Sequence, residues 1–169
     1  MAPDTNQQTP IYMTPACAAR LRAELKELLY KNRPEMVKTA AWAASLGDRS
    51  ENADYQYAKR ALRRFDNRIR FLTKRLEQAE IVDPLAQAEV AGDRVLFGAT
   101  VTVEYQDGEE KTLSIVGVDE YDPTRNHVSW TSPIARALLG KSAGDEVAFA
   151  TPGGRAELEI IKVEYRALD

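Results

Sequence analysis

Residues 58–79 read AKRALRRFDNRIRFLTKRLEQA, and this stretch decides the fold of the first half of the chain. Its apolar residues are spaced alternately by four and three positions: Ala58, Leu62, Phe65, Ile69, Leu72, Leu76 and Ala79. A repeat of about 3.5 residues predicts a helix that packs along its length against a second helix.

The partner helix is expected immediately upstream. Thr14 can cap a helix and Pro15 suits its first turn. One apolar face then follows at Leu21, Leu25 and Leu28. Pro34 is expected to kink or restart this helix, and Gly47 to end it. We therefore predict an antiparallel coiled-coil hairpin over residues 14–82, with arms about 45 Å long at the usual helical rise.

The second half of the chain has a different periodicity. Residues 83–93 read as a linker, and beyond them apolar and polar residues alternate between turn signals. Strands are expected at 100–105, 113–118, 127–130, 147–150 and 156–165, with one short helix at 134–139. The predicted fold class is α+β, in which an antiparallel sheet domain over residues 94–169 follows the hairpin. The polar segment 1–13 is expected to be a mobile extension.

Composition excludes several classes of protein. The 169 residues are 44% apolar with a net charge of −3, which is sufficient for a folded core. Basic and acidic side chains number 15 and 11 in residues 1–83, but 8 and 15 in the remainder. A single cysteine excludes an intrachain disulfide, and a single histidine excludes a multi-histidine metal site. Neither a secretory signal nor a membrane span is seen, so we expect a cytoplasmic protein without a membrane partner.

Residues 42–57, WAASLGDRSENADYQY, carry the most chemistry. Asp48 and Glu51 are three positions apart at the expected start of the second helix. Spacing alone favours a capping box, in which Asp48 caps the helix and Glu51 binds back to it. The alternative is half of a Mg²⁺ site, because two carboxylates can share an ion with another active centre. Tyr55 and Tyr57 are expected to pack against the first helix, and base stacking is the less favoured interpretation.

A basic stripe follows this segment. Within residues 59–75 the only acid is Asp66. The stripe consists of Lys59, Arg60, Arg63, Arg64, Arg68, Arg70, Lys74 and Arg75. A solvated charged face is the ordinary explanation, but repulsion along a face of nearly one sign favours contact with a phosphate backbone.

Residues 42–57, together with 132–139 and 151–154, closely resemble the GreA/GreB family of bacterial transcript cleavage factors, and its GreB group most of all. The match runs from about residue 14 to 165. The resemblance implies a factor that binds bacterial RNA polymerase and inserts its coiled coil through the secondary channel. There it would stimulate Mg²⁺-dependent cleavage of backtracked RNA near the nascent 3′ end. The polymerase would perform the cleavage, so the factor itself would not be an enzyme.

The resemblance also implies roles for particular residues. Asp48 and Glu51 would hold Mg²⁺ jointly with the polymerase, and the free protein would bind no ion tightly. The residues that would support them are Arg49, Ser50, Asn52 and Tyr55. The basic stripe would contact RNA. The second domain would be FKBP-like and would bind polymerase through Ser132, Pro133, Ile134 and Arg136. We expect the free chain to be a monomer.

Three other functions compete with this interpretation. A regulator that blocks the polymerase channel without cleavage would use the same hairpin, but it would not need two carboxylates at the tip. An FKBP-like domain could be a prolyl isomerase, although the sequence shows no aromatic-rich pocket pattern. The basic stripe could also bind free DNA or RNA.

Overall fold

The structure is a computed structural model that describes residues 9–169. Two compact units divide the chain. The hairpin unit is residues 19–78, and the sheet unit combines the segments before residue 19 and after residue 78. Within the described residues, no helix is long and apolar enough to cross a membrane.

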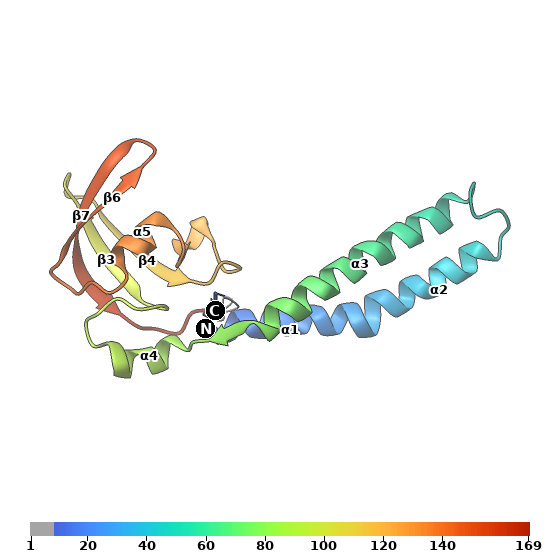
Figure 1. Ribbon diagram of the computed structural model, residues 1–169, viewed down its shortest axis with the longest axis horizontal. Coiled ribbons are helices and arrows are strands. Elements are labelled where there is room, and N and C mark those ends of the chain that lie inside the picture. The colour runs from blue at the N-terminus through green and yellow to red at the C-terminus, as the bar shows by residue number, and fades with distance from the viewer. Residues whose placement is uncertain (1–8) are drawn as a thin grey trace, which may run out of the picture. The chain divides into compact units, whose positions relative to one another are not determined.

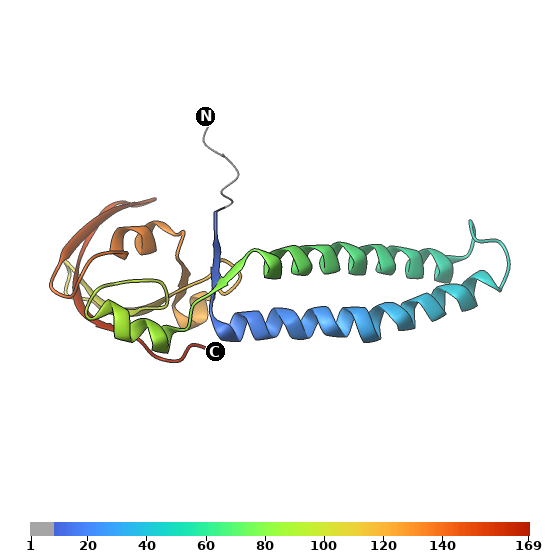
Figure 2. The ribbon, with the colours of Figure 1, turned by 60° about the horizontal axis from the view of Figure 1, so that its bottom comes forward.

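Two antiparallel arms form the hairpin unit, which confirms the predicted helical hairpin (Figures 1 and 2). The first arm is α1 (Pro15–Glu27), the π-helical turn η1 (Leu28–Asn32) and α2 (Arg33–Ala44), and the second arm is α3 (Ala53–Glu77). At about 1.5 Å per residue the arms measure about 45 Å and 38 Å. The second arm is shorter than expected because α3 begins at Ala53 and not directly after Asp48.

The apolar seam of α3 faces the other arm. Ala58, Ala61 and Leu72 are buried, while Leu62 and Phe65 are half-buried. A narrow seam is what two long helices with polar outer faces require, because each helix has only one neighbour.

Pro34 has the predicted effect on the first arm. Proline cannot donate a backbone hydrogen bond, so the regular helical ladder is interrupted one turn before it. The chain compensates with the π-helical turn, in which the Arg33 amide bonds to the Leu28 carbonyl, five residues earlier. α2 then starts with Pro34 in its first turn.

A five-stranded sheet with the order β5-β4-β3-β7-β6 dominates the sheet unit. Its strands are β3 (Thr100–Tyr105), β4 (Glu110–Val116), β5 (His127–Ser129), β6 (Glu146–Thr151) and β7 (Gly154–Glu164). The strands were all expected to be antiparallel, but β5 pairs with β4 in parallel. The connection between them contains the short 3₁₀ helix η2 (Pro123–Arg125), and it returns the chain so that β5 runs in the direction of β4.

The core of the sheet unit lies under α5 (Pro133–Leu138). Ala135 and Leu138 of this helix are fully buried against apolar residues of the sheet. The sheet residues of this core include Val101, Val103, Leu113, Ile115 and Ile160. The predicted α+β fold class is therefore confirmed, with a mixed sheet.

The ends of the expected hairpin differ from the prediction. Residues 1–8 of the expected mobile extension lie outside the described residues, but Ile11–Met13 form strand β1. β1 pairs in parallel with β2 (Ala79–Ile81), and Met13 is buried. Backbone pairing between segments so far apart in sequence leaves no local signal, which is why this strand was missed.

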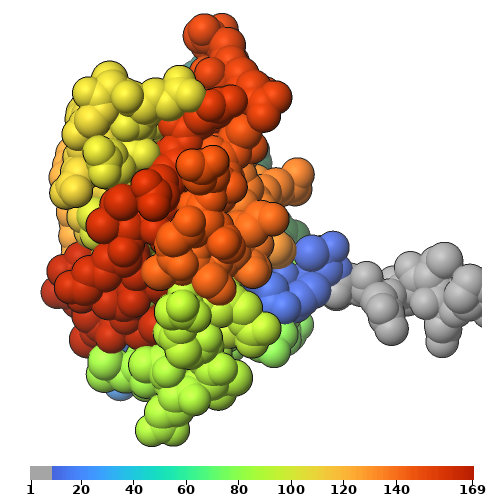
Figure 3. All heavy atoms as spheres, turned by 90° about the vertical axis from the view of Figure 1, so that its left-hand side faces the viewer, coloured from blue at the N-terminus to red at the C-terminus, as the bar shows by residue number. Residues whose placement is uncertain are grey.

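The expected linker 83–93 contains a helix, α4 (Pro84–Ala91). The Asp83 carboxylate caps it by accepting a hydrogen bond from the Leu85 amide at 3.0 Å. α4 lies at the surface of the sheet unit, in lime green in Figure 3, with Leu85 and Val90 more than half exposed. Its apolar residues surround the whole helix, so the sequence shows no helical periodicity there.

A buried carboxylate anchors the start of α1 within the sheet unit. Thr14 caps α1 as predicted, since its hydroxyl oxygen accepts a hydrogen bond from the Cys17 amide at 3.3 Å. Glu120 Oε2 accepts from the Thr14 amide at 3.1 Å and from the Gly117 amide at 2.9 Å. The Thr14 hydroxyl donates to the other oxygen of Glu120. Sequence reasoning missed Glu120, because its partner is about a hundred residues away.

Candidate functional site

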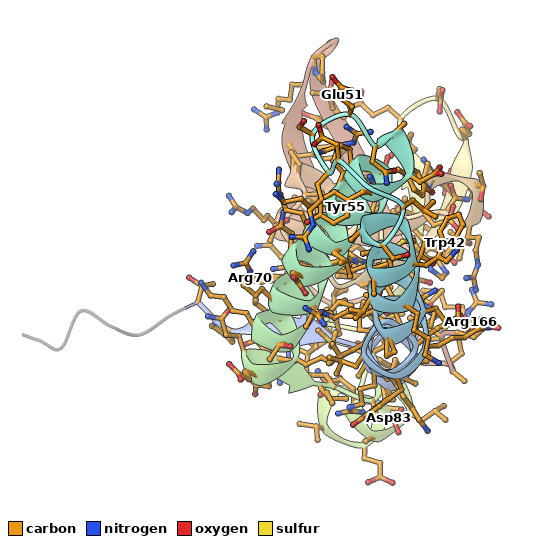
Figure 4. All side chains as sticks on the ribbon, turned by 90° about the vertical axis from the view of Figure 1, so that its right-hand side faces the viewer. Trp42, Glu51, Tyr55, Arg70, Asp83 and Arg166 are labelled. Carbon is orange, nitrogen blue, oxygen red and sulfur yellow. The ribbon has the colours of Figure 1, made fainter. Side chains whose placement is uncertain are left out.

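The loop that joins α2 to α3 presents the two candidate carboxylates. Asp48 and Glu51 are both exposed, and neither forms an ion pair with any residue the structure describes. In Figure 4, which looks at the hairpin from its loop end, Glu51 lies on the loop away from the helices. The two carboxylates are therefore accessible to a partner.

Ser50 donates two hydrogen bonds to the Asp48 carboxylate. Asp48 Oδ1 accepts hydrogen bonds from the Ser50 amide at 3.0 Å and from the Ser50 hydroxyl at 2.8 Å. These bonds stabilise the carboxylate, so they lower the pKa of Asp48 below its ordinary value, with the backbone bond contributing most. The lowered pKa extends the range over which Asp48 is ionised to more acidic pH, and a metal ligand must be ionised.

The predicted capping box is wrong. The residue that caps α3 is Asn52, whose Oδ1 accepts a hydrogen bond from the Tyr55 amide at 3.0 Å. Asp48 lies four residues before this cap and Glu51 one residue before it. Neither carboxylate is used to start the helix, and both side chains remain exposed in the loop.

The predicted support residues lie together around the loop. Asn52 Nδ2 donates a hydrogen bond to the Ala43 carbonyl at 2.5 Å, which connects the start of α3 to the end of α2. The Arg49 guanidinium lies 5.6 Å from the centre of the Tyr55 ring. The Gln56 side chain, which sequence reasoning did not select, donates to the Arg49 carbonyl at 2.9 Å. These contacts join the loop to both arms.

The loop alone does not build a closed metal site. In the described part of the chain, no three acidic, histidine or cysteine side chains are grouped closely enough to hold an ion. Two exposed carboxylates fit Mg²⁺ only when other ligands come from elsewhere, because Mg²⁺ is commonly bound by one or two carboxylates with phosphates and waters.

Most of the basic stripe is exposed along α3. Five members are exposed and form no ion pair within residues 9–169: Lys59, Arg60, Arg63, Arg64 and Lys74. Arg70 is also exposed and donates to the side chain of Asn67. Figure 4 shows Arg70 and Trp42 on opposite sides of the hairpin.

Two members of the stripe make contacts within the hairpin. Arg68 forms a bidentate ion pair with Glu24 of α1, with Nε–Oε1 at 2.6 Å and Nη2–Oε2 at 2.9 Å. Hydrogen bonding from Arg68 is the main reason that the pKa of Glu24 is lowered. Arg75 is half-buried. The guanidinium groups of Arg68 and Arg75 lie 5.0 Å and 4.7 Å from the centre of the Phe71 ring. Arg68 therefore joins the two arms, whereas Arg75 packs on Phe71 of its own helix.

The acid within the stripe is paired with the other arm. Asp66 Oδ1 accepts a hydrogen bond from Arg33 Nε at 2.8 Å. Because Arg33 neutralises Asp66, this carboxylate does not offset the positive charge of the exposed members of the stripe.

The two tyrosines after the loop have different environments. Tyr55 is half-buried beneath Arg49, whereas Tyr57 is 55% exposed. The expectation that Tyr57 packs against the first helix is therefore wrong. Its position in the second turn of α3 turns the side chain away from the seam.

The candidate polymerase-binding residues lie around α5 of the sheet unit. Ser132 Oγ caps this helix by accepting from the Ala135 amide at 3.3 Å, and Ile134 packs against the core. Pro133 and Arg136 are exposed. The apolar face of α5 is thus largely used by the core, and the exposed residues remain available to a partner.

A groove of about 490 Å³ lies elsewhere in the sheet unit, along β3, β6 and β7. Charged and polar side chains surround it, and Tyr105 is its one aromatic residue. Such a lining does not suit a prolyl ring, which requires an apolar pocket.

Comparisons with known proteins cover nearly the whole chain. Residues 11–81 match a family model described as transcription elongation factor, N-terminal, and residues 89–165 match transcription elongation factor, GreA/GreB, C-term. Transcription elongation factor GreB of Neisseria meningitidis serogroup B is 52% identical over 162 residues, covering 96% of this chain and 98% of that protein. GreB of Pseudomonas aeruginosa is 47% identical over 163 residues, covering 96% and 95%. The crystal structure of GreA factor homolog 1 of Thermus thermophilus aligns with a TM-score of 0.41 and 25% identity, covering 92% of this chain and 99% of that chain.

Proposed function

The chain belongs to the GreA/GreB family of transcription elongation factors, and from this premise we propose that it stimulates cleavage of backtracked RNA by bacterial RNA polymerase. The hairpin unit enters the secondary channel and brings its loop to the active centre. The observation that carries this proposal is the pair of exposed carboxylates, Asp48 and Glu51, on a loop fastened to both arms.

The two carboxylates act as ligands in trans. Asp48 and Glu51 would hold Mg²⁺ together with groups of the polymerase, since they fit a shared site and not a closed one. When bound, the ion supplies activation of the attacking water and stabilisation of the leaving oxygen. Ser50 hydrogen-bonds to the Asp48 carboxylate, and Asn52 bonds the loop to α2. The factor alone cleaves no RNA, because it brings only part of the site.

The remaining predicted surfaces have supporting roles in this proposal. The exposed members of the basic stripe contact phosphates of the extruded RNA, and their charge is not offset by Asp66. The sheet unit binds polymerase through the region around α5, where Pro133 and Arg136 are exposed. In this proposal the hairpin loop supplies the metal ligands, and the sheet unit supplies the affinity for polymerase.

Substitution of the carboxylates tests the proposal. Asp48→Asn and Glu51→Gln keep the size of each side chain but remove its charge. We expect each to reduce factor-stimulated cleavage in stalled complexes by roughly a hundredfold, because a charge-stabilising ligand is lost, while polymerase binding stays nearly unchanged. Glu35→Gln, an exposed carboxylate at the start of α2, is the matched control and is expected to cleave normally. Undiminished cleavage by both loop variants would overturn the proposal.

Salt dependence tests the role of the stripe. Replacing Arg60, Arg63 and Arg64 by alanine should weaken cleavage of long extruded RNA and reduce the slope of log affinity against log salt by about 2. A matched control replaces Arg20 and Arg22, which are exposed on α1 and outside the stripe. If the salt slope does not change in the stripe variant, the stripe does not contact RNA.

A further inference from the structure

Tyr57 is an exposed aromatic ring between the acidic loop and the basic stripe. It lies four residues after the first residue of α3, about 6 Å further along the helix axis. Its exposed fraction is 55%, and no hydrogen bond or ring contact to it is seen within residues 9–169. Tyr55, by comparison, is half-buried and covered by Arg49.

Exposed cations share one flank of α3 with this ring. Arg60 and Arg64 follow Tyr57 by three and seven residues, which places all three on the same side of a helix. Both arginines are exposed and form no ion pair in the described chain. The flank therefore offers a flat aromatic surface and, within about 10 Å along the axis, two exposed cations without an ion-pair partner in residues 9–169.

This combination fits single-stranded nucleic acid. Proteins that bind single strands pair a positive surface, which follows the phosphates, with aromatic rings on which bases stack. The end of the first arm is different, because its exposed side chains Trp42 and Leu46 are apolar, and Figure 4 shows Trp42 on the opposite side of the hairpin from Arg70. An apolar side of that kind suits a protein surface, whereas the flank with Tyr57 suits RNA.

We propose that Tyr57 is a stacking platform for a base of the extruded RNA, with Arg60 and Arg64 binding the phosphates that flank this base. The inference rests on the proposed function, which brings the RNA to the hairpin. It adds a base contact that holds the strand between the carboxylates and the stripe. Because every base has a flat face, the contact is independent of the RNA sequence.

Tyrosine variants combined with abasic RNA test this proposal. Stalled complexes are prepared with one abasic nucleotide at successive positions of the extruded strand, and the factor concentration for half-maximal cleavage is measured. Tyr57→Ala should raise this concentration about fivefold or more on intact RNA, as expected for loss of one stacked base. Tyr57→Phe keeps the ring and should restore the wild-type value. Tyr30→Ala removes a tyrosine that is 76% exposed on the other arm, and it is the matched control.

The abasic position distinguishes stacking from other contacts. At one position of the RNA, the abasic nucleotide should raise the wild-type concentration for half-maximal cleavage as much as Tyr57→Ala does on intact RNA. At that position it should cause no further rise for the Tyr57→Ala variant. If Tyr57→Ala equals Tyr30→Ala on intact RNA, the proposal is wrong. It is also wrong if Tyr57→Ala requires a higher concentration than the wild type by the same ratio at every abasic position. That result would indicate that Tyr57 contacts polymerase and not a base. In either case a retained effect of Asp48→Asn would show that only the stacking inference has failed.

Discussion

Asn52 connects the two arms at the loop, and its substitution should loosen the site without unfolding the hairpin. Its Oδ1 caps α3 through the Tyr55 amide at 3.0 Å, and its Nδ2 binds the Ala43 carbonyl at 2.5 Å. Loss of a cap costs about 1 kcal/mol, and loss of one further hydrogen bond costs about 1 kcal/mol. Asn52→Ala should therefore destabilise the loop locally by about 2 kcal/mol.

Amide hydrogen exchange measures this local stability. A loss of about 2 kcal/mol should increase exchange of the amides at the start of α3 roughly thirtyfold, while amides near Leu72 stay protected. Asn52→Asp is a graded control, because a carboxylate keeps the cap but cannot donate to Ala43. It should increase exchange only about fivefold. If both variants exchange like the wild type at Tyr55, the two hydrogen bonds do not hold the loop, and the argument for a fixed site fails.

Three further predictions concern stability and ionisation. Gly117→Ala should destabilise the sheet unit by about 2 kcal/mol in thermal unfolding, because an added Cβ would lie 2.5 Å from a backbone oxygen; Gly153→Ala, where the nearest atom is 3.9 Å away, should be nearly neutral. Ser50→Ala should raise the pKa of Asp48 towards its ordinary value in an NMR titration of the carboxyl carbon, and an unchanged titration would contradict the role of Ser50. Burial lowers the pKa of the His127 imidazole, because the folded state disfavours its charged form. Its contribution to stability is therefore complete above the ordinary pKa of about 6.5 and is lost as the pH falls through the lowered pKa. His127→Gln should reduce this pH dependence of the free energy of unfolding.

The hairpin could be predicted because its signals are local. The seam from Ala58 to Leu76 repeats regularly, Thr14 and Pro15 mark the start of the first helix, and Pro34 marks its interruption. By contrast, the pairing of β1 with β2 and the bonds of Glu120 to Thr14 join residues far apart in the chain. Contacts of that kind form only in the assembled fold, so no local sequence pattern predicts them.

The acidic loop shows where spacing is ambiguous. Asp48 and Glu51 have the separation of a capping box, but α3 begins only at Ala53 and Asn52 caps it through the Tyr55 amide. Asp48 and Asn52 are both favoured residue types at a helix N-cap, so only the position of the first helical residue decides which of them caps α3. Tyr57 was similarly ambiguous, since a residue near the loop can face either the seam or the solvent.

The Mg²⁺ dependence of stimulated cleavage tests the central claim most directly, namely that the hairpin supplies ligands for an ion shared with the polymerase. Cleavage in a stalled complex is measured over a range of Mg²⁺ concentrations with the wild-type factor, Asp48→Asn and Glu51→Gln. The account predicts that each variant requires more Mg²⁺ for half-maximal cleavage than the wild type, because one oxygen ligand is weakened. An identical Mg²⁺ requirement for all three proteins would contradict it.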